Sequence, residues 1–225
     1  MAGTTAGPTF RLVLILDAPT LAWEDARASL VAVLAAVPKG STLLVDRDRP
    51  SMAGGSSDAA RWRRLVAMRE ETARWGAPLA IGGRVDLALA VGADGVQLPE
   101  RGLDAAVVRA TFPSLWVGRS CHDRAGLDRA AAAGAHWATL SPVHAPFSKA
   151  PTGAPLGVRG FARAIAGLAL PVVGLGGIDG AAAAALFDAG AAAVATLGGV
   201  LGRADAVDRA CALLAGAPSG PLGPS

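Results

Sequence analysis

Short apolar runs alternate with longer amphipathic or alanine-rich stretches along this chain, eight of each, at about 25 residues per pair. The apolar runs show no polar alternation, which is typical of parallel strands covered on both faces. We expect strands at Leu12–Leu16, Thr42–Val45, Leu79–Ile81, Gly95–Leu98, Trp116–Gly118, Trp137–Leu140, Val172–Gly174 and Ala193–Thr196. We expect helices near Leu21–Val37, Asp58–Trp75, Val85–Val91, Asp104–Thr111, Asp123–Ala133, Val158–Ala166, Gly180–Ala189 and Asp205–Ala215.

Glycines mark the points at which three of these helices should end. A Gly-Ala pair precedes the next apolar run at residues 92–93, 134–135 and 190–191, and glycine is preferred just past a helix C-terminus. Eight strand–helix units predict an α/β fold of the (β/α)8 TIM-barrel type, whose lower size limit is about 200 residues. An open doubly wound sheet is the alternative, but no G-x-G-x-x-G follows the first strand.

The composition fits one folded domain with short tails. Hydrophobic residues make up 52% of the chain and charged residues 17%, which is enough to form a core and argues against general disorder. The first nine and last ten residues are rich in Gly, Pro, Ser and Ala. We therefore expect a single barrel domain at 10–215, with flexible tails at 1–9 and 216–225.

Charge and cysteine content exclude several classes of protein. The net charge is only +3, and the arginines are interspersed with acids, so no basic stripe for nucleic acid stands out. The two cysteines, Cys121 and Cys211, show no disulfide or zinc spacing. The apolar stretch 188–202 contains Asp188 and several glycines and is shorter than the ~20 residues that a membrane span needs. We expect a cytoplasmic protein without nucleic-acid or membrane partners, and the sequence leaves open a homo-oligomer.

Two glycine-rich segments follow the last two expected strands. They are Gly174-Leu-Gly-Gly-Ile178 and Leu197-Gly-Gly-Val-Leu-Gly202. Glycines let a phosphate approach the backbone N–H groups, and phosphate sites of TIM barrels recur at these two loops. The sequence predicts phosphate binding at Gly174, Gly176, Gly177, Gly198 and Gly199, the alternative being tight turns in a glycine-rich protein.

Two histidines fall on the face that carries the chemistry of such barrels. His122 follows the fifth expected strand and His144 the sixth, so either side chain is a candidate for moving a proton. The alternative is a hydrogen-bonded loop histidine. His136 precedes the sixth strand at the opposite end and is expected to be structural. The spacing of the three does not predict a metal site.

Other polar side chains on the same rim could bind anions. Only two of the 21 basic residues are lysines, and one of them, Lys149, lies beside Ser148 in the long loop 141–157. Ser148 and Lys149 are candidates for the phosphate. Arg47 and Arg49, together with Ser120 and Gln97, are candidates for a second anion or ring. The alternative for Arg47-Asp48-Arg49 is a solvated loop with local ion pairs.

Several segments resemble the family that contains thiamine phosphate synthase and the TenI-type thiazole tautomerase. The resemblance lies in Gly83–Leu98, Gly118–His122, Pro142–Lys149, Pro151–Gly157 and Pro171–Ile178. It runs in order along nearly the whole chain, and implies a TIM barrel that holds a thiazole phosphate on the loops after strands 7 and 8.

The two branches of this family differ in their chemistry. The synthase joins a pyrimidine pyrophosphate to the thiazole phosphate with Mg²⁺, and its pattern has Asn-Asp after strand 3 and an aspartate after strand 4. Those positions are Gly82, Gly83 and Gly102 here. Its Gln-x-Arg-x-Lys after strand 2 corresponds to Val45, Arg47 and Arg49.

The TenI branch is more similar at strands 3–5, although its histidine after strand 6 corresponds to Pro142, two residues before His144. The resemblance therefore favours a TenI-like tautomerase that moves a proton without a cofactor, using His144 or His122. The alternatives are a Mg²⁺-dependent thiamine phosphate synthase and a non-catalytic paralogue that only binds the phosphate ligand.

Overall fold

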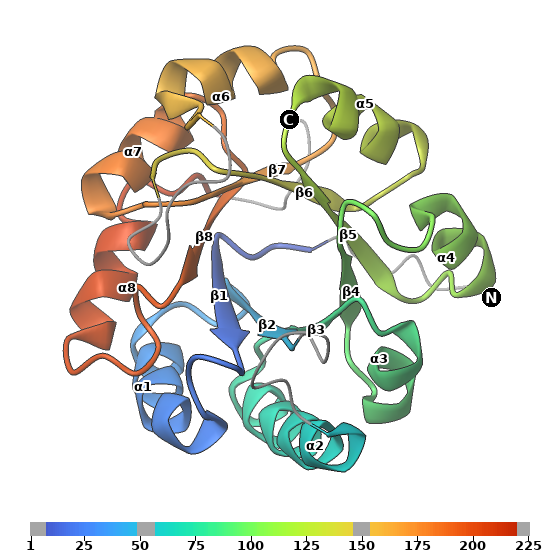
Figure 1. Cartoon of the computed structure of the whole chain (residues 1–225). Helices are drawn as coiled ribbons and strands as arrows, with labels where there is room; N and C mark the ends of the chain where they lie inside the picture. Colours follow the sequence, from blue (N-terminus) through green and yellow to red (C-terminus); the bar gives the residue numbers. More distant parts are fainter. Residues whose placement is uncertain (1–7, 49–56, 146–153, 220–225) are drawn as a thin grey trace.

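The strands close into a parallel barrel surrounded by helices (Figure 1). The computed structural model describes residues 8–48, 57–145 and 154–219. Within them the eight strands are β1 (Leu12–Asp17), β2 (Thr42–Arg47), β3 (Leu79–Gly82), β4 (Gly95–Leu98), β5 (Trp116–Cys121), β6 (Trp137–Leu140), β7 (Val172–Leu175) and β8 (Ala193–Leu197). Each pairs in parallel with its neighbours in chain order, and β8 closes on β1. The predicted TIM barrel is confirmed.

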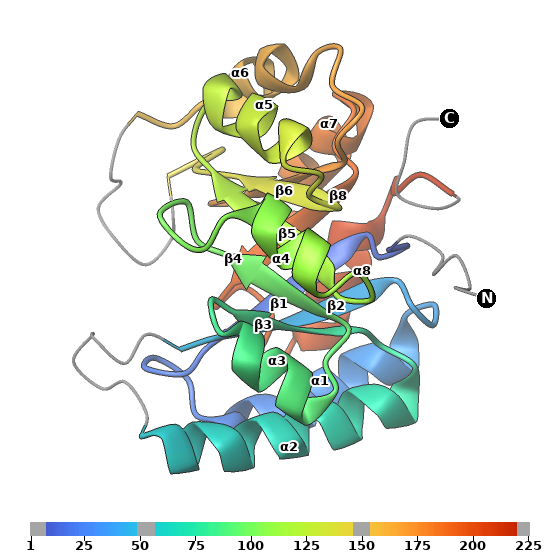
Figure 2. The same ribbon diagram turned by 90° about the vertical axis from the view of Figure 1, so that its right-hand side faces the viewer.

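One helix follows each strand and packs on the outside of the barrel (Figures 1 and 2). The helices are α1 (Trp23–Ala36), α2 (Asp58–Trp75), α3 (Val85–Val91), α4 (Ala105–Thr111), α5 (Arg124–Ala132), α6 (Gly157–Ile165), α7 (Gly180–Asp188) and α8 (Ala206–Leu214). Glycines with positive φ end α2 and α3 at Gly76 and Gly92, as expected at a C-terminal cap. Within the described part of the chain, no helix is both long and apolar enough to cross a membrane.

Alternate residues of each strand point into the barrel or out toward the helices. The inner cluster contains Val13, Ile15, Val45 and Val173, with Trp137 among them. The outer cluster, between strands and helices, is larger and includes Leu14, Leu44 and Leu140. Continuing the inner phase toward the strand ends places Asp17, Arg47, Gln97 and Ser120 at the mouth of the barrel, where the loops to the helices begin.

Two strands extend at least two residues further than the apolar runs predict, and four others extend by one residue. β2 continues through Asp46 to Arg47, and β5 continues to Cys121. Polar residues end these strands without leaving the ladder because they find partners inside the fold, described below. Arg47 and Ser120 therefore lie on strands rather than on loops, which fixes their direction.

At the opposite end of the barrel, residues that follow α8 lie against the start of β1. The buried Arg11 donates from Nε to the carbonyl of Pro218 at 2.8 Å and from Nη1 to the carbonyl of Ala192 at 3.1 Å. Of the two tails proposed from composition, residues 1–7 and 220–225 lie outside the described residues.

Candidate active site at the carboxyl ends of the strands

The predicted second-anion residue Arg47 lies at the barrel mouth and is paired across to β1. Its Nη1 donates to Asp17 Oδ1 at 2.7 Å, and Thr20 also donates to the Asp17 carboxylate. Asp17 is buried and the Arg47 side chain is 27% exposed. Its partner in the sequence prediction, Arg49, lies outside the described residues.

Gln97 and Ser120, both predicted as candidates for a second anion or ring, are hydrogen-bonded to each other. The Gln97 amide nitrogen donates to Ser120 Oγ at 3.1 Å, while its oxygen accepts from the indole Nε1 of Trp137 at 2.9 Å. Trp137 is buried across the barrel interior with Phe10 against its ring at right angles. Both ends of the Gln97 amide are thus used in orienting Ser120 and the floor of the mouth.

A buried ion network supports the ends of β2 and β3. Asp46 is fully buried and accepts from Nε of Arg61 at 3.1 Å and from Nη2 of Arg64 at 2.9 Å. Arg64 also reaches Asp48 at 2.7 Å, and Arg61 donates to the carbonyl of Gly82 at 3.0 Å. The alternative of local, solvated pairs around Arg47-Asp48-Arg49 is wrong for Asp48, which is buried against a helix.

His122 lies where β5 ends and points toward the neighbouring strand. Its Nδ1 donates to the carbonyl oxygen of Ser141 at 2.6 Å, and its Nε2 lies 4.0 Å from Oε2 of Glu100. Arg119 fixes the loop that carries Glu100 by donating to the backbone carbonyls of Glu100 and Leu103. The adjacent Cys121 is buried, and this burial raises the pKa of its thiol to about 11, so it is not a thiolate nucleophile.

His144 lies beside the first glycine loop. Its backbone N–H donates to the carbonyl of Gly176 at 2.9 Å, and a Cβ placed on Gly177 would lie 2.9 Å from the Cβ of His144. The loops after β6 and β7 are therefore in direct contact. This contact brings the second predicted histidine to the edge of the predicted phosphate site.

Four of the five predicted phosphate glycines form the loops after β7 and β8. Gly176, Gly177 and Gly198 have positive φ (114°, 56° and 73°). No hydrogen bond within the described residues uses the N–H groups of these three or of Gly199. Unpaired backbone donors at adjacent loops are what a phosphate needs. Gly174 differs, because it lies within β7 and faces Leu186 on the helix side.

Two predicted phosphate ligands, Ser148 and Lys149, lie outside the described residues. The third histidine, His136, lies at the far end of the barrel as expected. Its Nδ1 accepts from the N–H of Val117 at 2.8 Å and its Nε2 lies 2.9 Å from Arg109. Burial and the nearby Arg109 lower the pKa of His136 to about 4, so it is a neutral structural residue.

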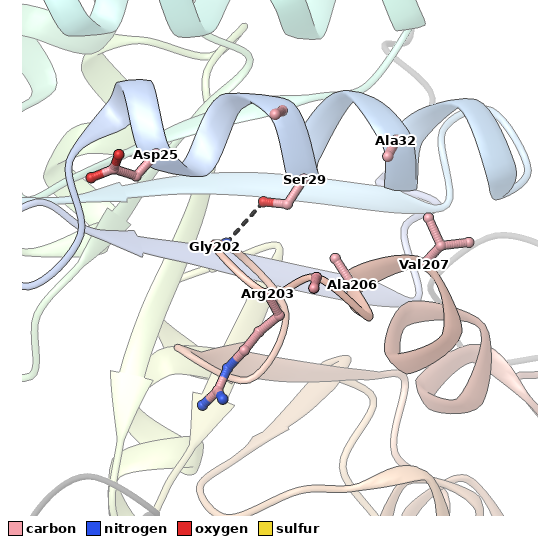
Figure 3. Close-up of a pocket in the computed structure, with 9 residues that line it drawn as sticks. Asp25, Ser29, Ala32, Gly202, Arg203, Ala206 and Val207 are labelled. Carbon is pink, nitrogen blue, oxygen red and sulfur yellow. Dashed lines mark hydrogen bonds between the residues drawn. The ribbon is translucent and has the colours of Figure 1, made fainter.

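The structure adds an arginine that the sequence patterns did not single out. Arg203 follows the glycines of the β8 loop, and its Nε donates to the carbonyl of Gly198 at 3.3 Å. The N–H of Gly202 donates to Ser29 Oγ at 2.8 Å, which ties this loop to α1 beside a groove of about 370 Å³. Figure 3 shows the Arg203 side chain pointing away from α1. Its position four residues after the Gly198-Gly199 pair was the feature of the sequence that could have indicated it.

We expect Arg203→Ala to weaken binding of a thiazole phosphate about tenfold, because a charge-assisted hydrogen bond contributes roughly 1.5 kcal/mol. Isothermal titration calorimetry with the phosphorylated and unphosphorylated thiazole measures this effect. Arg209→Ala is the matched control, since Arg209 is exposed on α8 and pairs with Asp205. Equal affinities of the two variants would remove Arg203 from the site.

The acidic side chains of this rim do not fit the magnesium ion that the synthase pattern implies. The acids at strand ends and in the following loops are Asp17, Asp46, Asp48, Glu100, Asp104, Asp123, Asp179 and Asp205. The loop segments 49–56 and 146–153 contain no Asp, Glu, His or Cys, so they add none to this set.

Seven of these eight acids are engaged elsewhere. Asp17, Asp46, Asp48 and Asp205 bind arginines, and Asp104, Asp123 and Asp179 accept from N–H groups of the first helical turns. A Cβ on Gly82 would lie 2.7 Å from the carbonyl oxygen of Asp46, so a side chain at that position has no room. Magnesium prefers carboxylates beside substrate phosphates, and this rim does not supply a group of them.

Comparison with known proteins identifies the family. The family model described as thiamine monophosphate synthase matches residues 13–200. The chain belongs to this family. It is 40% identical over 208 residues to "Putative thiamine-phosphate synthase" of Geobacter sulfurreducens, covering 92% of this chain and 93% of that protein. It is 30% identical to thiamine-phosphate synthase of Chloroflexus aurantiacus, covering 87% of each.

The fold agrees with a solved structure of similar name. The thiamine phosphate pyrophosphorylase from Pyrococcus furiosus superposes with a TM-score of 0.73 over 92% of this chain and 94% of that one, at 23% identity. The family assignment makes this barrel one of thiamine biosynthesis. Both sequence relatives carry the synthase name, and the comparisons do not distinguish the TenI branch within the family.

Proposed function

We propose that this chain is a thiamine phosphate synthase, which joins a thiazole phosphate to a pyrimidine pyrophosphate and releases pyrophosphate. The observation that carries the proposal is the 40% identity, along almost the full length of both chains, to a relative named for this activity. The rim geometry supports the binding of two anionic substrates, because the glycine loops and Arg47 lie on different sides of one barrel mouth.

The residues of the chain have separable tasks in this proposal. The N–H groups of Gly176, Gly177, Gly198 and Gly199 bind the phosphate of the thiazole, with the Arg203 guanidinium above the β8 loop. Arg47 faces the pyrophosphate, and the Gln97–Ser120 pair lies between them at the floor of the mouth. Holding the two rings together turns a bimolecular reaction into an effectively unimolecular one. No step is assigned to a metal ion, because the acids of the rim do not fit one.

The test is a single-pot assay with both substrates. We expect thiamine phosphate and pyrophosphate in equal amounts, measured by chromatography and by a coupled phosphate assay, and far less product when the thiazole lacks its phosphate. No product after a long incubation with excess Mg²⁺ would contradict the proposal.

A second candidate, isomerisation of a carboxythiazole phosphate to its aromatic tautomer, is favoured by one observation. The reaction needs proton transfer and no metal, and seven of the eight rim acids are engaged in ion pairs or caps while two histidines remain at the mouth. Conversion of the tautomer in the presence of EDTA, followed by NMR, tests it. Binding of the thiazole phosphate without either reaction would instead favour the non-catalytic paralogue.

A further inference from the structure

The eighth rim acid, Glu100, differs from the other seven in its surroundings. Within the described residues its carboxylate pairs with no arginine and caps no helix N-terminus, and its Oε2 lies 4.0 Å from Nε2 of His122. Its side chain is 39% exposed and that of His122 is 52% exposed, so both lie open to a ligand at the mouth. Among the described residues, the Glu100 carboxylate therefore takes part in no ion pair with an arginine and in no helix cap, and it lies next to the imidazole of His122.

The hydrogen bond on the other side of the ring defines the state of His122. A carbonyl oxygen only accepts, so Nδ1 of His122 carries the proton that is donated to Ser141. In the neutral ring Nε2 then has a free lone pair, and it is Nε2 that faces Glu100. At 4.0 Å the two groups do not share a hydrogen bond, which leaves Nε2 free to accept a proton from a bound molecule.

Both groups follow the ends of neighbouring strands, His122 directly after β5 and Glu100 two residues after β4. His122 is two residues beyond Ser120 on β5, in the phase that points into the mouth, and Ser141 lies at the end of β6 beside it. Arg119 holds the Glu100 loop through the carbonyls of Glu100 and Leu103. Asp123, the acid directly after His122, caps α5 through the N–H of Gly126.

We infer that His122 is the proton acceptor of this site and that Glu100 is its positioning residue, stabilising the imidazolium once the proton has moved. The inference rests on the isomerisation proposed above as the second candidate. The ligand loses one proton from a ring carbon to Nε2, the electron pair of the broken C–H bond enters the ring, and one proton returns at a different carbon. Atoms and charge are unchanged overall, so no oxidant, reductant or metal is required.

The role given to Glu100 requires its carboxylate to carry a negative charge. A carboxylate attracts the positive charge that the imidazole gains once a proton has moved to Nε2, and Glu100 lies 4.0 Å from Nε2 without blocking it. A positioned acid or base contributes about 10²–10⁴-fold to a rate. We expect His122→Gln to lower kcat about 100-fold and Glu100→Gln about tenfold, each with little change in KM.

The experiment measures isomerisation of the carboxythiazole phosphate by the full chain, in EDTA, for wild type, E100Q, H122Q and the double variant. Binding of the aromatic thiazole phosphate is measured in parallel by calorimetry. Asp104→Asn is the matched control, because Asp104 lies in the same loop but caps α4 through the N–H of Ala106. We expect E100Q to slow wild type about tenfold, to leave H122Q unchanged, and to preserve binding.

The outcomes separate the inference from the function on which it rests. A wild type that isomerises the ligand, with E100Q equal to it, would overturn the role of Glu100 while the function stands. E100Q slowing H122Q as much as wild type would show that Glu100 does not act through the histidine, and overturns the inference too. A wild type that binds the phosphate but does not isomerise the ligand overturns both.

Discussion

Replacing Arg61 with methionine is expected to lower the free energy of unfolding by about 3 kcal/mol or more, the typical effect of removing one partner from a buried ion pair. The Arg61 side chain is 1% exposed and its partner Asp46 is fully buried. Methionine fills similar volume but leaves the carboxylate with Arg64 alone, and the Gly82 carbonyl loses its donor. Urea denaturation followed by tryptophan fluorescence measures the change.

Arg74→Met on the same helix is the matched control. Arg74 is 66% exposed and its nitrogen lies 3.6 Å from Glu71, and such surface pairs contribute about 0–1 kcal/mol. A loss in Arg61→Met no larger than that in Arg74→Met would show that the network does not stabilise the rim.

The deficit of Arg61→Met should depend on pH in a defined direction. Burial raises the pKa of Asp46, opposed by Arg64 and Arg61, so removal of Arg61 raises it further. A carboxyl whose pKa is raised in the folded state contributes stability at low pH and loses it as the pH rises through the folded pKa. The gap between Arg61→Met and wild type is therefore expected to be smaller at about pH 5 than at about pH 7.5.

The order of strands and helices follows from the sequence because it depends on local apolar runs and glycine stops. The loops after β7 and β8 follow as well, since Gly176, Gly177 and Gly198 adopt the positive φ that their residue type allows. Each of these features depends on residues that are close together in the sequence.

Long-range partners were not predictable in this way. Asp46 meets Arg61 and Arg64 from a helix that begins eleven residues after β2 ends, and nothing in residues 45–49 indicates this pairing. Glu100 meets His122 only through the register of β4 on β5, in which Leu98 lies beside Arg119. The shear of the closed barrel determines which residues of two neighbouring strands lie side by side. The hydrophobic periodicity within one strand carries no information on this register.

Replacing Gly177 with alanine is expected to weaken binding of the thiazole phosphate at least about tenfold and to destabilise the fold by about 1–3 kcal/mol. An added Cβ would lie 2.3 Å from the carbonyl oxygen of Ala145, at a φ of 56°. The loop after β7 must then move away from the loop after β6, which displaces the backbone donors of the predicted phosphate site. Calorimetry with the thiazole phosphate and urea denaturation give the two readings.

Gly167→Ala separates backbone strain from displacement of the site. Gly167 has a φ of 71°, no atom lies within 4 Å of an added Cβ, and it follows α6 at the opposite end of the barrel. It should lose about 1 kcal/mol of stability through strain and keep full affinity. If Gly177→Ala also keeps full affinity, the phosphate does not bind at the β6–β7 loop contact, and the site must be moved toward β8. A loss of affinity in Gly177→Ala alone ties the phosphate to the place where His144 and Gly176 meet.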